Sequence, residues 1–194
     1  MTGSTRIRDA TPADARAIAS VHVDTWRSTY RGHFPDTLLD GLDLERWTAQ
    51  RERRLREAAA DEVNIVAERG GEVVGFAMAG PARETDPGMG EVYAIYVRDG
   101  AQRSGVGTAL LAEAARRLDA LGQRGMLIWV LRENAKGRSF YERMGGRAER
   151  EKAETLGVPS GPRHEIIEIG YVWDDTGPLR SRSAGGSSGS TQRM

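Results

Sequence analysis

One segment restricts the fold more than any other: a predicted amphipathic helix followed directly by a short apolar run. In residues 105–121 the apolar positions recur at spacings of four, four, four and three, at Val106, Leu110, Ala114, Leu118 and Leu121. This is the period of one face of a helix. After a break at residues 122–125, the chain is continuously apolar to residue 131, which is typical of a strand buried on both faces. The pair predicts a layered α/β domain.

Strand and helix signals surround this segment. Strands are predicted at residues 6–10, 63–68, 73–80 and 91–97, with a glycine-containing hairpin turn at 69–72, and a last pair at 147–152 and 165–172. Helices are predicted from Thr11-Pro12 to about residue 25, at 44–60 and at 135–144, with an irregular helical link at 26–42. This order predicts a mixed sheet and not an all-parallel, doubly wound one.

The length of 194 residues predicts a single domain followed by a tail. We expect the domain to cover residues 1–174. From Asp175 onward the chain is rich in Gly, Ser and Arg with almost no apolar residues, so residues 175–194 are expected to be disordered.

Composition excludes several classes of protein. The chain has no cysteine, so it has no disulfide, no Cys-ligated metal and no cysteine nucleophile. The 28 basic residues equal the 28 acidic ones, which argues against a general binder of nucleic acid or anionic membranes. No signal peptide or membrane span is predicted, so a cytoplasmic protein is expected. His22, His33 and His164 lack metal-ligand spacing, and no metal site is predicted.

The start of the predicted helix at residue 105 is a candidate anion site. A helix start has unpaired N–H groups and a partial positive charge, and Gly105 and Gly107 would let a phosphate approach the main chain. The alternative is that both glycines serve only close packing of the helix on the sheet. The spacing disfavours two other phosphate loops, because no Lys follows Gly107 and the third glycine of a dinucleotide fingerprint is absent.

A second motif lies further along the chain and makes a family resemblance plain. Gln102-x-x-Gly105-x-Gly107 together with Asn134-x6-Tyr141-Glu142-x2-Gly145 resembles the GCN5-related N-acetyltransferase (GNAT) superfamily. The predicted element order from residue 6 to about 173 is similar to that fold. The resemblance implies a mostly antiparallel central sheet flanked by helices, whose splayed central strands form an acetyl-CoA cleft.

The resemblance implies acetyl-CoA as the acetyl donor and assigns roles by position. In such enzymes the glycine loop holds the pyrophosphate, which here would be Gln102, Arg103, Ser104, Gly105, Val106, Gly107 and Thr108. Ile95, Tyr96 and Val97 would offer main-chain groups to the pantetheine arm. Asn134 would contact the cofactor near the acetyl group. Tyr141 matches the usual general acid, which protonates the departing thiolate; its alternative is a core aromatic beside Phe140.

An amine must lose a proton before it attacks, because at a pKa of about 10.4 only roughly one molecule in a few thousand is neutral at pH 7. Many family members place a catalytic Glu where this chain has Glu91. Its alternative is a solvated carboxylate at a strand end, with a water relay as the base. Ribosomal-protein-type N-terminal acetyltransferases often carry an acidic residue where this chain has Trp129, which disfavours a protein acceptor.

The predicted function is therefore direct transfer of acetyl from acetyl-CoA to the amine of a small molecule, in a ternary complex without a covalent enzyme intermediate. A protein or peptide amine acetyltransferase is one alternative. A non-catalytic acyl-CoA sensor on the same fold is another. The expected partners are acetyl-CoA and an amine, without nucleic acid or membrane. A homodimer is a habit of the family and has no support in these residues.

Overall fold

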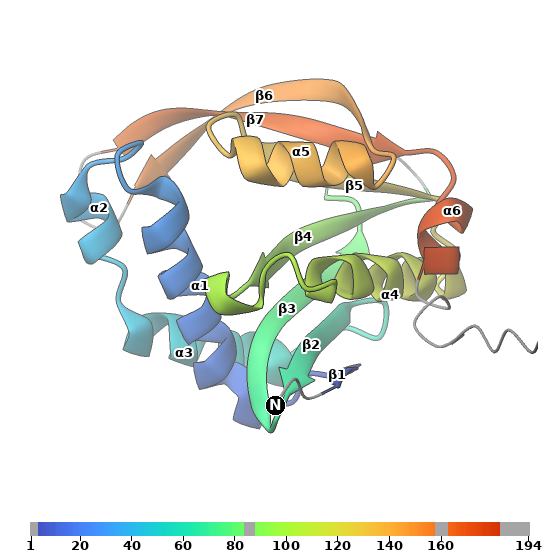
Figure 1. Ribbon diagram of the computed structural model, residues 1–194, viewed down its shortest axis with the longest axis horizontal. Helices are drawn as coiled ribbons and strands as arrows, with labels where there is room; N and C mark the ends of the chain where they lie inside the picture. Colours follow the sequence, from blue (N-terminus) through green and yellow to red (C-terminus); the bar gives the residue numbers. More distant parts are fainter. Residues whose placement is uncertain (1–3, 84–87, 158–162, 183–194) are drawn as a thin grey trace, which may run out of the picture.

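A seven-stranded sheet forms the centre of the computed structural model, in the order β1-β2-β3-β4-β5-β7-β6 (Figure 1). The structure describes residues 4–83, 88–157 and 163–182. The strands are β1 (Thr5–Asp9), β2 (Val63–Arg69), β3 (Glu72–Pro81), β4 (Met89–Val97), β5 (Gly125–Leu131), β6 (Arg147–Gly157) and β7 (Arg163–Trp173). Only β4 and β5 pair in parallel among these strands. The predicted mixed, mostly antiparallel sheet is confirmed.

Helices cover the two faces of the sheet. They are α1 (Ala15–Tyr30), α2 (Asp36–Asp40), α3 (Leu44–Arg56), α4 (Val106–Ala120), α5 (Ala135–Arg143) and α6 (Gly177–Arg180), with 3-10 turns η1 (Pro12–Asp14) and η2 (Asp99–Ala101). On one face, Leu110 and Leu118 of α4 and Tyr141 of α5 pack against the sheet. On the other, Ile18 and Val21 of α1 pack against β3. The sheet is therefore buried between two helical layers.

A β-bulge in β4 separates the two central strands. Met78 of β3 pairs with Ala94, whereas the next residue, Ala79, pairs with Val92, so Tyr93 is an extra residue. The parallel pairing with β5 runs only to Val92, and Figure 1 shows β4 and β5 diverging beyond it. Bulges bend a strand and increase its twist, so the bulge at Tyr93 accounts for the splayed strands.

Several predicted boundaries differ from the observed ones. α1 continues to Tyr30 and α3 stops at Arg56. The final hairpin is longer than predicted, because β6 reaches Gly157 and β7 begins at Arg163. Most of β6 is exposed at the edge of the sheet, and its charged residues gave no alternation from which its length could be predicted.

The expected disorder from Asp175 is wrong for the first part of the predicted tail. Residues 177–180 form α6, which lies beside α4 (Figure 1). Leu179 is 1% exposed and belongs to the main apolar cluster, and Arg180 forms an ion pair with Asp119 of α4. Burial of Leu179 in the core stabilises α6 although the surrounding residues are polar. Residues 183–194 lie outside the described residues.

A buried histidine and a buried arginine meet between α1 and α3. His22 and Arg51 are only 6% and 5% exposed, and Nη2 of Arg51 lies 3.2 Å from Nδ1 of His22. Because a guanidinium can only donate, the imidazole nitrogen accepts and the ring is neutral. Burial, with the charge of Arg51, lowers the pKa of His22 to about 3.

This lowered pKa predicts that acid weakens the fold. An unfolded histidine has a pKa of about 6.5. Between pH 6.5 and 3 the unfolded chain therefore binds one more proton than the folded chain, and the free energy of unfolding decreases as the pH is lowered. We expect the free energy of unfolding to fall by about 2 kcal/mol from pH 7 to pH 5 through this group. Urea denaturation at both pH values measures it. His22→Gln should remove this decrease, and the exposed His33→Gln should retain it; an equal decrease in both variants contradicts the assignment.

Candidate functional site

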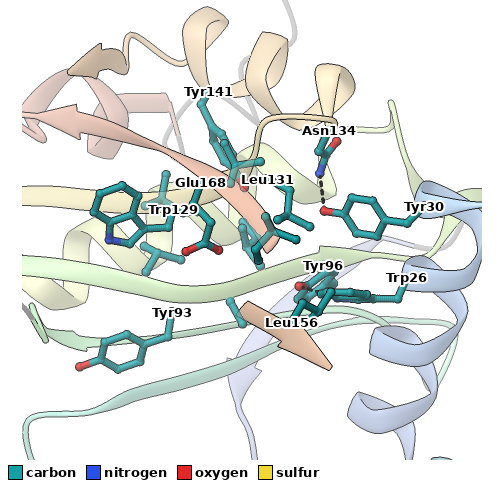
Figure 2. Close-up of a pocket in the computed structure, with 16 residues that line it drawn as sticks. Trp26, Tyr30, Tyr93, Tyr96, Trp129, Leu131, Asn134, Tyr141, Leu156 and Glu168 are labelled. Atoms are coloured by element: carbon teal, nitrogen blue, oxygen red, sulfur yellow. Dashed lines mark hydrogen bonds between the residues drawn. The ribbon is translucent and has the colours of Figure 1, made fainter. Parts of the chain in front are cut away.

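A cavity of about 160 Å³ lies where β4 and β5 separate. Figure 2 shows side chains from α1, β4, β5, α5 and β7 around it. Its lining residues are Trp26, Tyr30, Val92, Tyr93, Ala94, Ile95, Tyr96, Ile128, Trp129, Val130, Leu131, Asn134, Tyr141, Leu156, Ile166 and Glu168. Residues from both ends of the chain therefore meet at the gap in the sheet.

Aromatic side chains form much of the wall. Trp26 and Tyr30 of α1 lie one helical turn apart, with ring centroids 4.8 Å from each other. The indole Nε1 of Trp26 donates to the hydroxyl of Tyr96 at 2.9 Å. On the bulge, Tyr93 donates to the carbonyl of Pro81 at 2.5 Å. These hydrogen bonds fix the polar ends of the rings, and all four rings line the cavity.

Tyr141 of α5 points into the cavity and is 7% exposed (Figure 2). No described residue forms a hydrogen bond with its hydroxyl. Burial raises the pKa of Tyr141 above its ordinary value, because a phenolate would be poorly solvated there. The side chain is thus a protonated phenol at neutral pH with a free donor aimed at the site.

Asn134 caps α5 at the entrance to the same cavity. Its Oδ1 accepts from the amide of Gly137 at 2.8 Å, and its Nδ2 donates to the hydroxyl of Tyr30 at 3.3 Å. A Cβ atom on Gly137 would lie 2.8 Å from this side-chain amide. Asn134 therefore connects α1 to α5 and orients the helix that carries Tyr141.

The glycine loop forms the turn between β4 and α4. Gly105 has a φ of +85° and is the N-cap of α4, and Arg103 has a positive φ of 57°. The amide of the Gln102 side chain donates to the carbonyl of Val97 at 3.1 Å. The first turn of α4, which begins after this turn, has backbone amides without intrahelical partners and the positive end of the helix dipole. Ser104 lies in the turn, and Val106, Gly107 and Thr108 are the first three residues of α4.

The main chain of β4 has an open edge next to this loop. Ile95, Tyr96 and Val97 pair with β3 on one side, but the pairing with β5 has already ended. Backbone groups on an open edge can bind an extended, amide-containing ligand by strand addition. A Cβ atom on Gly107 would lie 3.9 Å from the side chain of Val97, so the loop and the open edge are adjacent.

Glu91 occupies a different environment from the other predicted site residues. It is 1% exposed and is not among the residues that line the cavity. Its carboxylate accepts hydrogen bonds from the backbone amide of Arg83, at 3.0 Å, and from the Arg83 guanidinium through both Nε and Nη2. By contrast, Ile95, Tyr96, Asn134 and Tyr141 all line the cavity.

Sequence reasoning missed the contribution of the last hairpin. Leu156 of β6 and Ile166 and Glu168 of β7 line the cavity, and none of them was a predicted site residue. The single carboxylate between Ile167 and Ile169 in an otherwise apolar stretch was the available signal. Its position at the site depends on the pairing of Glu168 with Leu131 of β5, which no local pattern reveals.

Two negative findings complete the description. The described residues contain no group of three or more His, Asp or Glu side chains that could hold a metal ion. Among the same residues, no helix is long and apolar enough to cross a membrane.

Comparisons with known proteins agree with this geometry. A model of the acetyltransferase (GNAT) family matches residues 22–146. The uncharacterized N-acetyltransferase YuaI of Bacillus subtilis is 32% identical over 176 residues, or 90% of this chain and 96% of that protein. L-methionine sulfoximine/L-methionine sulfone acetyltransferase of Pseudomonas aeruginosa is 28% identical over 143 residues, or 73% of this chain and 80% of that protein. PaiA N-acetyltransferase of Thermoplasma acidophilum, crystallised with coenzyme A, superimposes with a TM-score of 0.64 at 20% identity, over 86% and 98% of the two chains.

The capping hydrogen bond of Asn134 predicts a structural cost that is separate from any role in binding. Asn134→Ala should lower the free energy of unfolding by about 1 kcal/mol, because the first turn of α5 loses its cap. Asn134→Asp keeps an acceptor for the amide of Gly137 and should lose less stability. Chemical denaturation of both variants measures the difference. Equal losses would mean that the cap contributes nothing.

Proposed function

The chain belongs to the acetyltransferase (GNAT) family, and from this premise we propose that it transfers acetyl from acetyl-CoA directly to the amine of a small molecule. The observation that carries the proposal is the succession of three features from the glycine loop along β4 to the cavity. These are the amides at the start of α4, the open edge of β4 and the free phenol of Tyr141. They suit, in that order, a pyrophosphate, a pantetheine arm and a thiolate.

The residues of this chain fit acetyl-CoA, which would supply an activated thioester. The first-turn amides and the positive end of the α4 dipole suit the pyrophosphate, with Gln102 and the positive-φ Arg103 holding the turn. The crystal structure of the Thermoplasma acidophilum relative contains coenzyme A. The free edge at Ile95–Val97 suits the two amide groups of the pantetheine arm.

Tyr141 is the proposed general acid. Its raised pKa keeps the phenol protonated at neutral pH, as a proton donor requires. When the amine nitrogen bonds to the carbonyl carbon and the carbon–sulfur bond breaks, the thiolate takes the phenolic proton. The nitrogen of the nascent amide loses its remaining extra proton, so acetylation of an amine that starts as an ammonium releases one proton to solvent for each acetyl group transferred from acetyl-CoA.

A small acceptor is supported by the size of the cavity, about 160 Å³, which Leu156 and Ile166 of the last hairpin help to line. The Pseudomonas aeruginosa relative is named for small-molecule substrates. Glu91 as the base stays a prediction, since its carboxylate would have to leave Arg83 or act through water.

The pyrophosphate loop is tested by Gly107→Trp. A Cβ atom there would already lie 3.5 Å from Phe140, so an indole must extend over the main chain where the phosphates would bind. We expect the affinity for acetyl-CoA, measured by isothermal titration calorimetry, to fall at least about 100-fold. Gly100→Trp is the matched control, because Gly100 is exposed and a Cβ there meets nothing within 4 Å. Unchanged affinity in the Gly107 variant would refute the loop proposal.

The acid role is tested by Tyr141→Phe in a thiol-release assay with a panel of amines. We expect kcat to fall about 100-fold while the affinity for acetyl-CoA is retained, because loss of a general acid costs about 100-fold or more. Tyr171→Phe is the control, since its hydroxyl bonds Glu142 and does not line the cavity. Unchanged turnover of the Tyr141 variant would disprove the assignment. Tight acetyl-CoA binding by wild-type protein without thiol release from any amine would instead favour a sensor.

A further inference from the structure

The cavity contains one charged side chain. Of the sixteen described residues that line it, Glu168 alone carries a charge, and the others are aromatic, aliphatic or amide residues. No arginine, lysine or histidine is among them. Figure 2 shows the carboxylate of Glu168 in the centre of the site, below Tyr141 and between Trp129 and Leu131.

We propose that Glu168 binds the ammonium group of the acceptor and accepts its proton, and that the acceptor is a primary amine on an aromatic or apolar body without an acid group. The proposal rests on the acetyl-transfer function above and specifies its base and its substrate class. It also replaces Glu91 as the group that would contact the amine.

Glu168 is accessible in a way that Glu91 is not. Its side chain is 24% exposed and lines the cavity, whereas the carboxylate of Glu91 is enclosed by hydrogen bonds from Arg83. The strand pairing holds Glu168 opposite Leu131 of β5 and Lys152 of β6. Its backbone is therefore fixed on both sides, while its carboxylate lines the cavity and is paired on the β6 side with Lys152.

The charged groups around Glu168 come from two neighbouring elements. On β6, Nζ of Lys152 lies 3.7 Å from its carboxylate, and Glu154 contributes a repulsive charge. Arg83, after β3, contributes an attractive one. Burial raises the pKa of Glu168 and outweighs the opposing effect of Lys152. A carboxylate with a raised pKa is a better proton acceptor near neutral pH than an exposed one.

The rest of the cavity selects the body of the acceptor. The aromatic rings of Trp26, Tyr30 and Tyr96 line the cavity, where aromatic rings can attract a cation by cation–π interaction and accommodate an apolar or aromatic substituent. A substrate carboxylate would find no cation among the described lining residues and would be repelled by Glu168, and the neighbouring Lys152 is already paired with Glu168 and lies over the ring of Trp129. Desolvating an unpaired carboxylate costs several kcal/mol, so the cavity disfavours α-amino acids.

The proton transfers balance with this assignment. The ammonium gives one proton to the Glu168 carboxylate, and the neutral amine forms the carbon–nitrogen bond as the carbon–sulfur bond breaks. The thiolate takes the phenolic proton of Tyr141, and the nascent amide gives up a second proton. The ammonium nitrogen has then lost two protons, one to Glu168 and one from the nascent amide. One of them restores the phenol of Tyr141 and the other leaves to solvent, so both side chains return to their starting protonation states.

The experiment compares Glu168→Gln with wild-type protein, using acetyl-CoA and phenethylamine. We expect kcat/KM to fall about 100-fold, and the acid limb of the wild-type kcat/KM profile to disappear. Glu165→Gln is the matched control on the same strand, because Glu165 is exposed and does not line the cavity. Unchanged kcat/KM in Glu168→Gln, or a large loss in Glu91→Gln alone, would overturn the assignment.

The substrate class is tested by replacing phenethylamine with L-phenylalanine, which has the same body and an added carboxylate. We expect kcat/KM for phenethylamine to be at least ten times higher than for L-phenylalanine; a preference for phenylalanine would overturn the class.

Calorimetric binding of phenethylamine to CoA-loaded protein separates this proposal from the proposed function. Binding that Glu168→Gln weakens tenfold, without thiol release from any amine, would refute acetyl transfer and support the ammonium site. Thiol release that is insensitive to Glu168→Gln would support acetyl transfer and refute the ammonium site at Glu168.

Discussion

The end of the hydrogen bonding between β4 and β5 is the constraint on which the site depends. Beyond Val92 and Ile128 the two strands no longer pair, and buried backbone groups without partners are costly. A ligand with amide groups can pair with the edge of β4, and the side chains that surround the gap form the cavity. The glycine loop follows β4 after the short η2 turn, so the proposed anion site and the cavity share one strand.

The bulge at Tyr93 also changes which residues face which layer. In a regular strand, residues two apart share a face, so Val92, Ala94 and Tyr96 would lie together. Instead, Val92 packs in the same cluster as Ile95 and Val97, while Ala94 and Tyr96 pack in the cluster on the α1 side. The bulge therefore reverses the alternation, so that even-numbered residues before it point to the same face as odd-numbered residues after it. Glu91 precedes the bulge, so alternation counted from residues 95–97 would assign it to the wrong face.

Local signals predicted the parts of the fold that local physics determines. The periodicity of residues 105–121, the turn at Gly105 and the apolar run of β5 all correspond to observed elements. Sequence could not locate the bulge, because its register depends on the partner strand. The sequence also did not predict that Glu168 lies at the site, because its position there results from pairing with a strand more than thirty residues earlier in the chain. The proposed pyrophosphate and acid residues follow from motifs, whereas the proposed acceptor side of the cavity is built by long-range pairing.

The orientation of α5 relative to β7 explains how Tyr141 and Glu168, the proposed acid and base, can line the same small cavity. Asn134 and Tyr141 are seven residues apart, nearly two helical turns, so both project from one face of α5. Asn134 fixes the first turn through Gly137 and Tyr30. At the other end, Nε1 of Trp173 donates to the carbonyl of Met144 at 3.0 Å. The Trp173 ring also packs on Gly146, where a Cβ atom would lie only 2.5 Å from it. Trp173 and Glu168 belong to the same strand, β7. The helix that carries the phenol is therefore attached to the strand that carries the carboxylate, and the separation of the two groups is set by the sheet and not by a flexible loop.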